Sequence, residues 1–171
     1  RNVLMKNGIR VVANNYASSN VDMPTMPLDI LSVFNNDNSV VVFDVGGDDD
    51  GALALGQYKQ YFDKYGYEMH FIVNTKRPLT RTNDELIEIA ERIESASRLK
   101  FTDIYNNTNL SDQTDETTLF SGYDEIKMLS KKMGIVIKKN CGIDKALSNV
   151  PTNLKDTVFR MNICILRPWE I

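Results

Sequence analysis

The stretch VVVFDVGGDDD, from Val40 to Asp50, decides the predicted fold because an apolar run ends there in a polar, glycine-containing turn. Four apolar residues lead towards Asp44, and Gly46 and Gly47 precede three further aspartates. A near-continuous apolar run is typical of a strand covered on both faces, as in a parallel sheet. Because such sheets bind ligands at the carboxyl ends of their strands, this turn is a candidate site.

Two interpretations of the turn stay open. The Asp44 carboxylate suits Mg²⁺, held directly or through water, and Gly46 and Gly47 allow backbone N–H groups to approach a phosphate closely. In the other interpretation the strand simply stops, and Asp48–Asp50 cap the next helix and complement its positive end. We predict a phosphate or metal role for Asp44 with Gly46, and a helix-start role for Asp48–Asp50.

The same alternation of strand and helix continues outward along the chain, with apolar stripes at helical spacing between short apolar runs. Strands are predicted at 9–12, 40–45, 68–74, 101–106, 135–138 and 163–166, and helices at 28–34, 51–65, 83–99, 117–133 and, more weakly, after 143. Repeated βαβ units imply right-handed crossovers and a parallel sheet. We therefore predict a single α/β domain over residues 1–171: three layers, α/β/α, Rossmann-like, with a mainly parallel sheet.

Two further strand ends carry candidate binding residues. In FIVNTKRP the strand ends at Asn74, and the side chains of Lys76 and Arg77 can reach an anion or simply form a solvated cationic turn. In IYNNTNL the amide of Asn106 or Asn107 can read the edge of a base, since it offers both a donor and an acceptor. Asparagine is also common in turns, which is the interpretation that the sequence alone favours for this pair.

Composition restricts the class of protein. The chain has 171 residues, 42% hydrophobic and 25% charged, which suits one ordinary domain with its own core. A net charge of −3 gives no strong nucleic-acid signal. No apolar run approaches the roughly 20 residues that cross a bilayer, and no export leader is visible. With Cys141 and Cys164 isolated from each other, the sequence predicts reduced thiols and a cytoplasmic protein.

Several sites are disfavoured. His70 is the only histidine and lies in an apolar run, which predicts a core position, so no catalytic triad or His/Cys metal cluster can be assembled. The segment GALALGQY has the two glycines of a phosphate-binding G-x-x-x-x-G-K-S/T loop, but Gln57 and Tyr58 replace its lysine and hydroxyl residue. Trp169 is predicted to anchor the tail by packing.

Taken together, the segments VVVFDVGGDDDGALALGQY, FIVNTKRP, RIESASRLK, IYNNTNL and RPWE resemble a group of uncharacterised bacterial ATP-binding proteins, similar to the ParA/MinD/CobQ-like (deviant Walker) branch of P-loop NTPases. The likeness covers nearly the whole chain, and DVGGDD and NNTNL are its most specific parts. It implies a P-loop NTPase-like fold, ATP with Mg²⁺, and often a dimer.

Site residues follow from the resemblance. Asp44 would be the Walker B acid, which organises Mg²⁺ and the attacking water. Gly46 would contact the γ-phosphate, with Gly47 beside it. Asn106 would match the asparagine that contacts adenine in this branch, with Asn107 as the fallback. Asn74 and Arg77, which come from the strand end in FIVNTKRP and not from the resemblance, are the remaining candidate nucleotide contacts.

The chain departs from this branch at its beginning. The strand, P-loop lysine and helix with which members begin are missing from the sequence, and the chain opens at Arg1 without an initiator methionine. We expect a C-terminal portion of a longer ATPase, inactive alone. Because the P-loop strand borders the Walker B strand in this branch, we expect Val40–Val45 to pair with a rearranged strand or with another copy, as a homo-oligomer, possibly a dimer.

Two other classes of function remain. The chain can be a non-enzymatic α/β interaction or dimerisation module that has lost nucleotide binding. It can also be a small-molecule enzyme that holds a cation at Asp48–Asp50. The cellular process and the protein partner do not follow from a fold.

Overall fold

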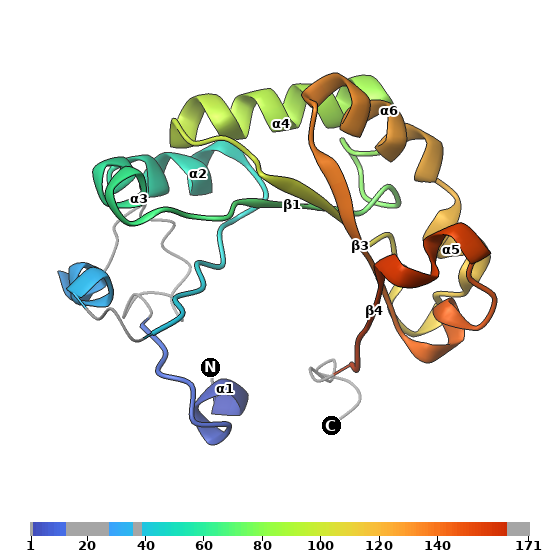
Figure 1. Ribbon diagram of the computed structural model, residues 1–171, viewed down its shortest axis with the longest axis horizontal. Helices are drawn as coiled ribbons and strands as arrows, with labels where there is room; N and C mark the ends of the chain where they lie inside the picture. The colour runs from blue at the N-terminus through green and yellow to red at the C-terminus, as the bar shows by residue number, and fades with distance from the viewer. Residues whose placement is uncertain (1, 13–27, 36–38, 164–171) are drawn as a thin grey trace. The chain divides into compact units, whose positions relative to one another are not determined.

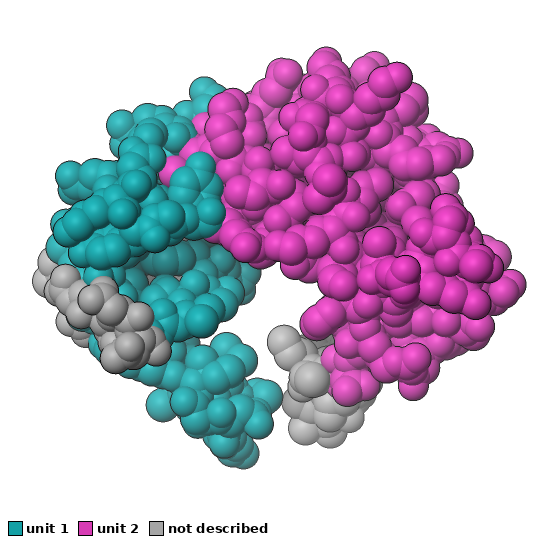
Figure 2. All heavy atoms as spheres, viewed as in Figure 1, with its two compact units in different colours: residues 1–67, 95–98 teal, residues 68–94, 99–171 magenta. Residues whose placement is uncertain are grey.

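The computed structural model describes residues 2–12, 28–35 and 39–163 of the chain (Figure 1). The chain divides into two compact units, residues 1–67 with 95–98 and residues 68–94 with 99–171 (Figure 2). Each unit is described by itself below, as unit 1 and unit 2. The single domain expected over residues 1–171 stays a prediction.

Unit 2 contains a four-stranded sheet with the order β1-β2-β3-β4, in which every neighbouring pair is parallel. The strands are β1 (His70–Val73), β2 (Asp103–Asn106), β3 (Val136–Gly142) and β4 (Val158–Arg160). This confirms a mixed α/β fold with a parallel sheet. Strands β1 and β2 lie within predicted strands, and β3 overlaps one. Strand β4 lies upstream of the predicted strand 163–166, most of which is outside the described residues.

Helices connect these strands. Unit 2 holds α4 (Asn83–Ser97, whose end belongs to unit 1), α5 (Glu116–Phe120), α6 (Tyr123–Met133) and the short 3-10 helices η2 (Ser111–Gln113), η3 (Asp144–Leu147) and η4 (Thr152–Thr157). Each crossover adds the next strand in the same direction, so right-handed crossovers place α4 and α6 on one face of the sheet, as Figure 1 shows. The apolar stripes of these helices are buried, at Leu86, Ala90, Ile93, Ile126 and Leu129.

Unit 1 holds α1 (Asn2–Lys6), η1 (Leu28–Asn35), α2 (Asp49–Gly56) and α3 (Lys59–Tyr65). Its centre is aromatic: the ring of Phe34 stacks on Tyr61 at 4.8 Å and meets Phe62 edge-on at 5.5 Å between centroids. A Cβ added to Gly56 would come 2.8 Å from the carbonyl oxygen of Ala96. Glycine therefore allows α2 to lie close against the last turn of α4.

The predicted strand Val40–Val45 is not formed. Within the described part of the chain these residues belong to no ladder, and Val40 and Val42 are 94% and 85% exposed. A strand exists only where a neighbour accepts its backbone hydrogen bonds, and apolar character alone cannot supply that neighbour. The expected pairing with a rearranged strand is therefore wrong here, and pairing with another copy stays a prediction. Residues 9–12 likewise form no strand.

Other expectations have mixed outcomes. His70 is exposed rather than in the core, because it lies on the sheet face opposite to the buried Phe71 and Val73. Cys141 is buried, and burial raises the pKa of its thiol to about 11. Cys164 and Trp169 lie outside the described residues. None of the helices described combines the length and apolar character needed to span a membrane.

Candidate functional site

The loops that follow β1 and β2 meet at the carboxyl edge of the sheet in unit 2, and Asn74 ties them together. Its Oδ1 accepts the backbone N–H groups of Lys76 at 2.9 Å and Asn109 at 3.2 Å, and its Nδ2 donates to the Asn109 carbonyl at 3.2 Å. The backbone N–H of Thr75 donates to the Thr108 hydroxyl at 3.2 Å. The predicted nucleotide contact Asn74 thus serves in this structure as a link between two loops.

Asn106 uses the hydrogen-bonding capacity of its side chain inside the protein. The residue is fully buried, and its Nδ2 donates to the Leu119 carbonyl at 3.1 Å and to Oδ1 of Asn140 at 3.0 Å. Its Oδ1 accepts the backbone N–H of Thr108 at 3.1 Å. To read the edge of a base, Asn106 would first have to break one of these bonds.

Asn107 is different. Its backbone N–H donates to the Val73 carbonyl at 2.8 Å, which fastens it to the end of β1. Its side-chain Oδ1 is buried and has no hydrogen-bond partner among the described residues. A buried acceptor without a donor is costly, and such groups commonly mark a missing ligand or water. Of the two candidate base contacts, Asn107 therefore retains a spare acceptor.

A hollow of about 400 Å³ lies beside these loops, at the start of α6. We call it the carboxyl-edge pocket; its lining includes Thr75, Lys76, Arg81, Ser121, Gly122 and Glu125. The sequence singled out Lys76 but missed the others, which come from separate elements. Arg77, in contrast, is exposed and is not part of the lining, and its backbone N–H donates to the Asn74 carbonyl at 3.1 Å.

The predicted phosphate and metal tip belongs to unit 1. Asp44, Gly46 and Gly47 are all exposed, directly before α2. Asp48 is the N-cap of α2, and its Oδ1 accepts the backbone N–H of Gly51 at 2.9 Å, which confirms the helix-start role predicted for this residue. The tip and the asparagine loops thus fall in different units, and the structure describes each set separately.

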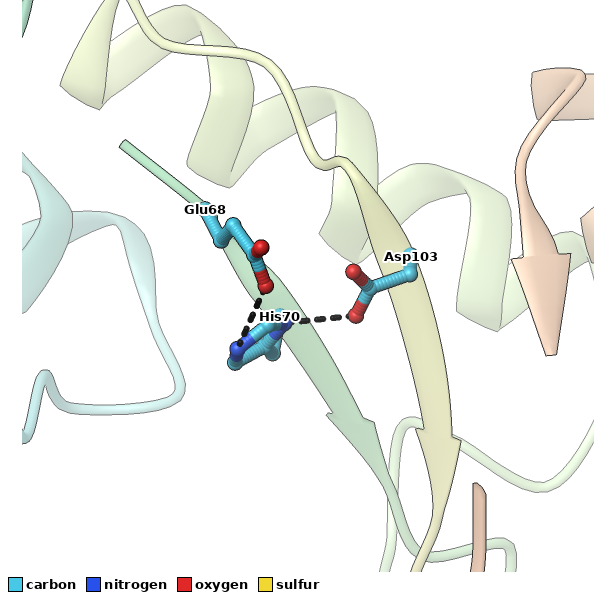
Figure 3. A group of neighbouring side chains, drawn as sticks. All are labelled: Glu68, His70 and Asp103. Atoms are coloured by element: carbon cyan, nitrogen blue, oxygen red, sulfur yellow. Dashed lines mark hydrogen bonds and ion pairs between the residues drawn. The ribbon is translucent and has the colours of Figure 1, made fainter. Parts of the chain in front are cut away.

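A charged cluster that the sequence did not reveal lies at the amino ends of the strands in unit 2. Nδ1 of His70 is 2.5 Å from Oδ1 of the buried Asp103, and its Nε2 is 3.7 Å from Oε2 of Glu68 (Figure 3). Nζ of Lys138 lies 2.7 Å from Glu68 and 3.2 Å from Asp103. Hydrogen bonds, chiefly to Glu68, raise the pKa of Lys138.

The cluster offers one nitrogen and two carboxylate ligands, a set that suits a divalent transition metal. However, the ammonium of Lys138 already bridges both carboxylates and supplies the positive charge that a metal would bring. The register between β2 and β3 shifts so that Ile104 pairs with Ile137 but Tyr105 with Lys139, which leaves Lys138 unpaired in the ladder. The cluster therefore acts as an ion-pair network that joins β1, β2 and β3.

No protein-family model, no curated protein and no solved structure matches this chain.

Proposed function

We propose that this chain is a nucleotide-binding protein of the ParA/MinD-like type, with a P-loop NTPase-like three-layer fold, which binds ATP together with Mg²⁺. One observation supports the proposal most. The candidate base contacts lie at the carboxyl edge of an all-parallel sheet, where such folds bind ligands, and Asn107 there holds a buried acceptor that has no donor in the described part of the chain. The exocyclic amine of adenine is a donor that suits this oxygen.

The residues of the tip also suit their proposed partners. The exposed Asp44 carboxylate is a hard oxygen ligand of the kind that Mg²⁺ prefers, and the exposed backbone at Gly46 and Gly47 has no side chain to keep a phosphate away. Bound Mg²⁺ would neutralise phosphate charge and orient water. The chain contains no G-x-x-x-x-G-K-S/T loop, so we expect weak binding and no turnover by this chain alone.

Calorimetric titration of the whole chain with Mg·ATP, Mg·GTP and AMP tests the proposal. We expect weak binding that favours adenine, with Asn107→Ala reducing the affinity by a few-fold to about tenfold, the size of one lost hydrogen bond. Asn153→Ala, an exposed asparagine in η4, is the matched control and should leave the affinity unchanged. Equal binding of ATP and GTP, unaffected by Asn107→Ala, would contradict the base contact. The absence of any nucleotide binding would overturn the function.

A second candidate, a non-enzymatic interaction or dimerisation module, is favoured by the exposed apolar side chains of Val40 and Val42. Exposed strand-like segments of this kind recruit partners through their unpaired backbone. Self-association without nucleotide binding would support this candidate.

A further inference from the structure

We propose that the carboxyl-edge pocket binds a small phosphate monoester at a position separate from the ATP proposed above. The pocket volume of about 400 Å³ lies near the lower end of the roughly 300–1,000 Å³ typical of ligand sites, so it suits a small metabolite better than a whole nucleoside triphosphate. Three features of unit 2 carry this inference: two unpaired cations, an uncapped helix start and a closely packed wall.

The cations are Lys76 and Arg81, which line the pocket from the loop between β1 and α4. Neither side chain takes part in an ion pair within the part of the chain described. The backbone of Arg81 is held by a hydrogen bond from its N–H to Oε2 of Glu85 at 2.8 Å. Its guanidinium forms no ion pair among the described residues, although it interacts electrostatically with the Glu85 carboxylate, and its planar fork of donors matches the geometry of a phosphate.

The helix start belongs to α6. Its N-cap is Gly122, which makes no side-chain capping hydrogen bond, and both Ser121 and Gly122 line the pocket. The first turn of a helix leaves backbone N–H groups without intrahelical partners and carries partial positive charge. An anion in the pocket can accept hydrogen bonds from these groups while Lys76 and Arg81 balance its charge.

The start of α6 forms one wall of the pocket, and close packing holds it in place. A Cβ added to Gly122 would come 2.2 Å from the hydroxyl oxygen of Thr75, so the start of α6 lies directly against the loop after β1. The hydroxyl of Thr75 lies in turn 3.2 Å from that of Thr108. Leu79, in the loop before α4, and Ser111, at the start of η2, have φ values of 65° and 58°, a left-handed conformation unusual for residues other than glycine.

The carboxylate of Glu125 restricts the kind of anion that the pocket can bind. This carboxylate lines the same pocket, and no ion pair is formed by it within the described residues. A bare polyanion would be repelled by this group, whereas a phosphate monoester with a hydroxyl or amine can donate to it. Leu110 provides an apolar surface for the carbon skeleton.

Amide-resolved NMR titration of the whole chain with inorganic phosphate, then with glycerol phosphate, tests the inference. We expect saturable shifts at Ser121, Gly122 and Tyr123. Lys76→Gln and Arg81→Gln should each weaken phosphate binding at least about fivefold, and Glu125→Gln should strengthen it, a gain that misfolding cannot mimic. Lys132→Gln, which removes an equal charge from the last turn of α6, is the control and should change nothing.

Two results would overturn the inference. One is equal weakening by Lys132→Gln and Arg81→Gln, which would show diffuse attraction rather than a site. The other is displacement of phosphate by Mg·ATP with parallel loss of both affinities in Arg81→Gln, which would make the pocket part of the nucleotide site. Because inorganic phosphate is the probe, failure of ATP to bind would leave this test valid and would count only against the proposed nucleotide function.

Discussion

Asn106 and Asn140 are register partners on neighbouring parallel strands, and the side-chain amide of Asn106 donates to Oδ1 of Asn140 at 3.0 Å. Both residues are fully buried. Nδ2 of Asn140 donates onward to the Thr157 hydroxyl at 2.8 Å, so the hydrogen bonds run from β2 through β3 to the end of η4. A satisfied network of this kind fixes one register in the sheet, because every slipped register would leave its amides unpaired.

Asn106→Ala should therefore lower the free energy of unfolding by about 1–3 kcal/mol, the cost of leaving buried partners unsatisfied. Asn107→Ala should not lower it, since the buried Asn107 Oδ1 has no partner among the described residues to lose and its removal relieves the cost of an unpaired acceptor. Urea unfolding followed by circular dichroism measures both. An unchanged free energy of unfolding in Asn106→Ala would show that the Asn106 network contributes little.

Gly122→Ala should destabilise unit 2 because the new Cβ would come within 2.2 Å of the Thr75 side chain. Overpacking of this kind typically costs about 1–3 kcal/mol, and here it would also distort the wall of the carboxyl-edge pocket. Gly47→Ala is the control, because a Cβ there meets nothing within 4 Å. Unfolding midpoints in urea compare the two, and an unchanged midpoint for Gly122→Ala would contradict the tight packing.

Asp115 should make stability depend on pH. As the N-cap of α5 its carboxylate accepts the Thr118 N–H and the Thr117 hydroxyl, each at 2.8 Å, and the Thr118 backbone bond is the main cause that lowers its pKa from 3.8 to about 2. A folded-state pKa below the unfolded value means stability that is present above about pH 4 and lost as the pH falls towards 2.

The melting temperature of Asp115→Ala should accordingly lie below that of the parent at pH 7, with a gap that narrows between pH 4 and pH 2. Asp156→Ala, which changes an exposed aspartate in η4, is the control, and its difference in melting temperature from the parent is measured at the same pH values. Thermal unfolding at several pH values measures the difference. A gap that stays constant down to pH 2 would show that the cap does not depend on the ionised carboxylate.

Val42→Lys should reduce self-association if Val40–Val45 pairs with another copy, because a charge on an exposed strand edge opposes edge-to-edge pairing. The folded state should be unaffected, since the Val42 side chain is 85% exposed. Leu53→Lys, an exposed leucine on α2 in the same unit, is the control. Light scattering after size-exclusion chromatography would detect the change, and identical masses for parent and both variants would argue against a dimer built on this segment.

Local patterns were sufficient to predict much of unit 2. The runs at 68–74, 101–106 and 135–138 contain or overlap β1, β2 and β3, and the stripe at 83–99 matches α4 closely. These elements bury one side against the core, and the spacing of their apolar residues predicts which side is buried. The helix start at Asp48 was equally local, since an N-cap depends only on the next few residues.

What the sequence did not reveal depends on contacts between distant residues. Val40–Val45 has the composition of a strand but finds no ladder in the described chain. The helix predicted over 117–133 is divided into α5 and α6 next to Gly122, where Thr75 approaches from another loop. The apolar neighbours of His70 predict a core position. In the structure His70 lies on the exposed face of β1, where its imidazole pairs with the carboxylate of Asp103. Arg81 lies in the loop before α4 and Glu125 lies in α6, and only the folded chain shows that both line one pocket.

The order of the strands has a consequence for how the protein is synthesised. Each strand pairs only with the strands immediately before and after it in the chain, and the first pairing, between His70 and Asp103, closes over 33 residues. During synthesis β1 therefore emerges before β2, its pairing partner. Strands β3 and β4 can then pair in turn, and none of these strands has to be inserted between two others. Parallel pairing is slow to form, and this order keeps the separation in sequence between paired strands as short as the crossovers allow.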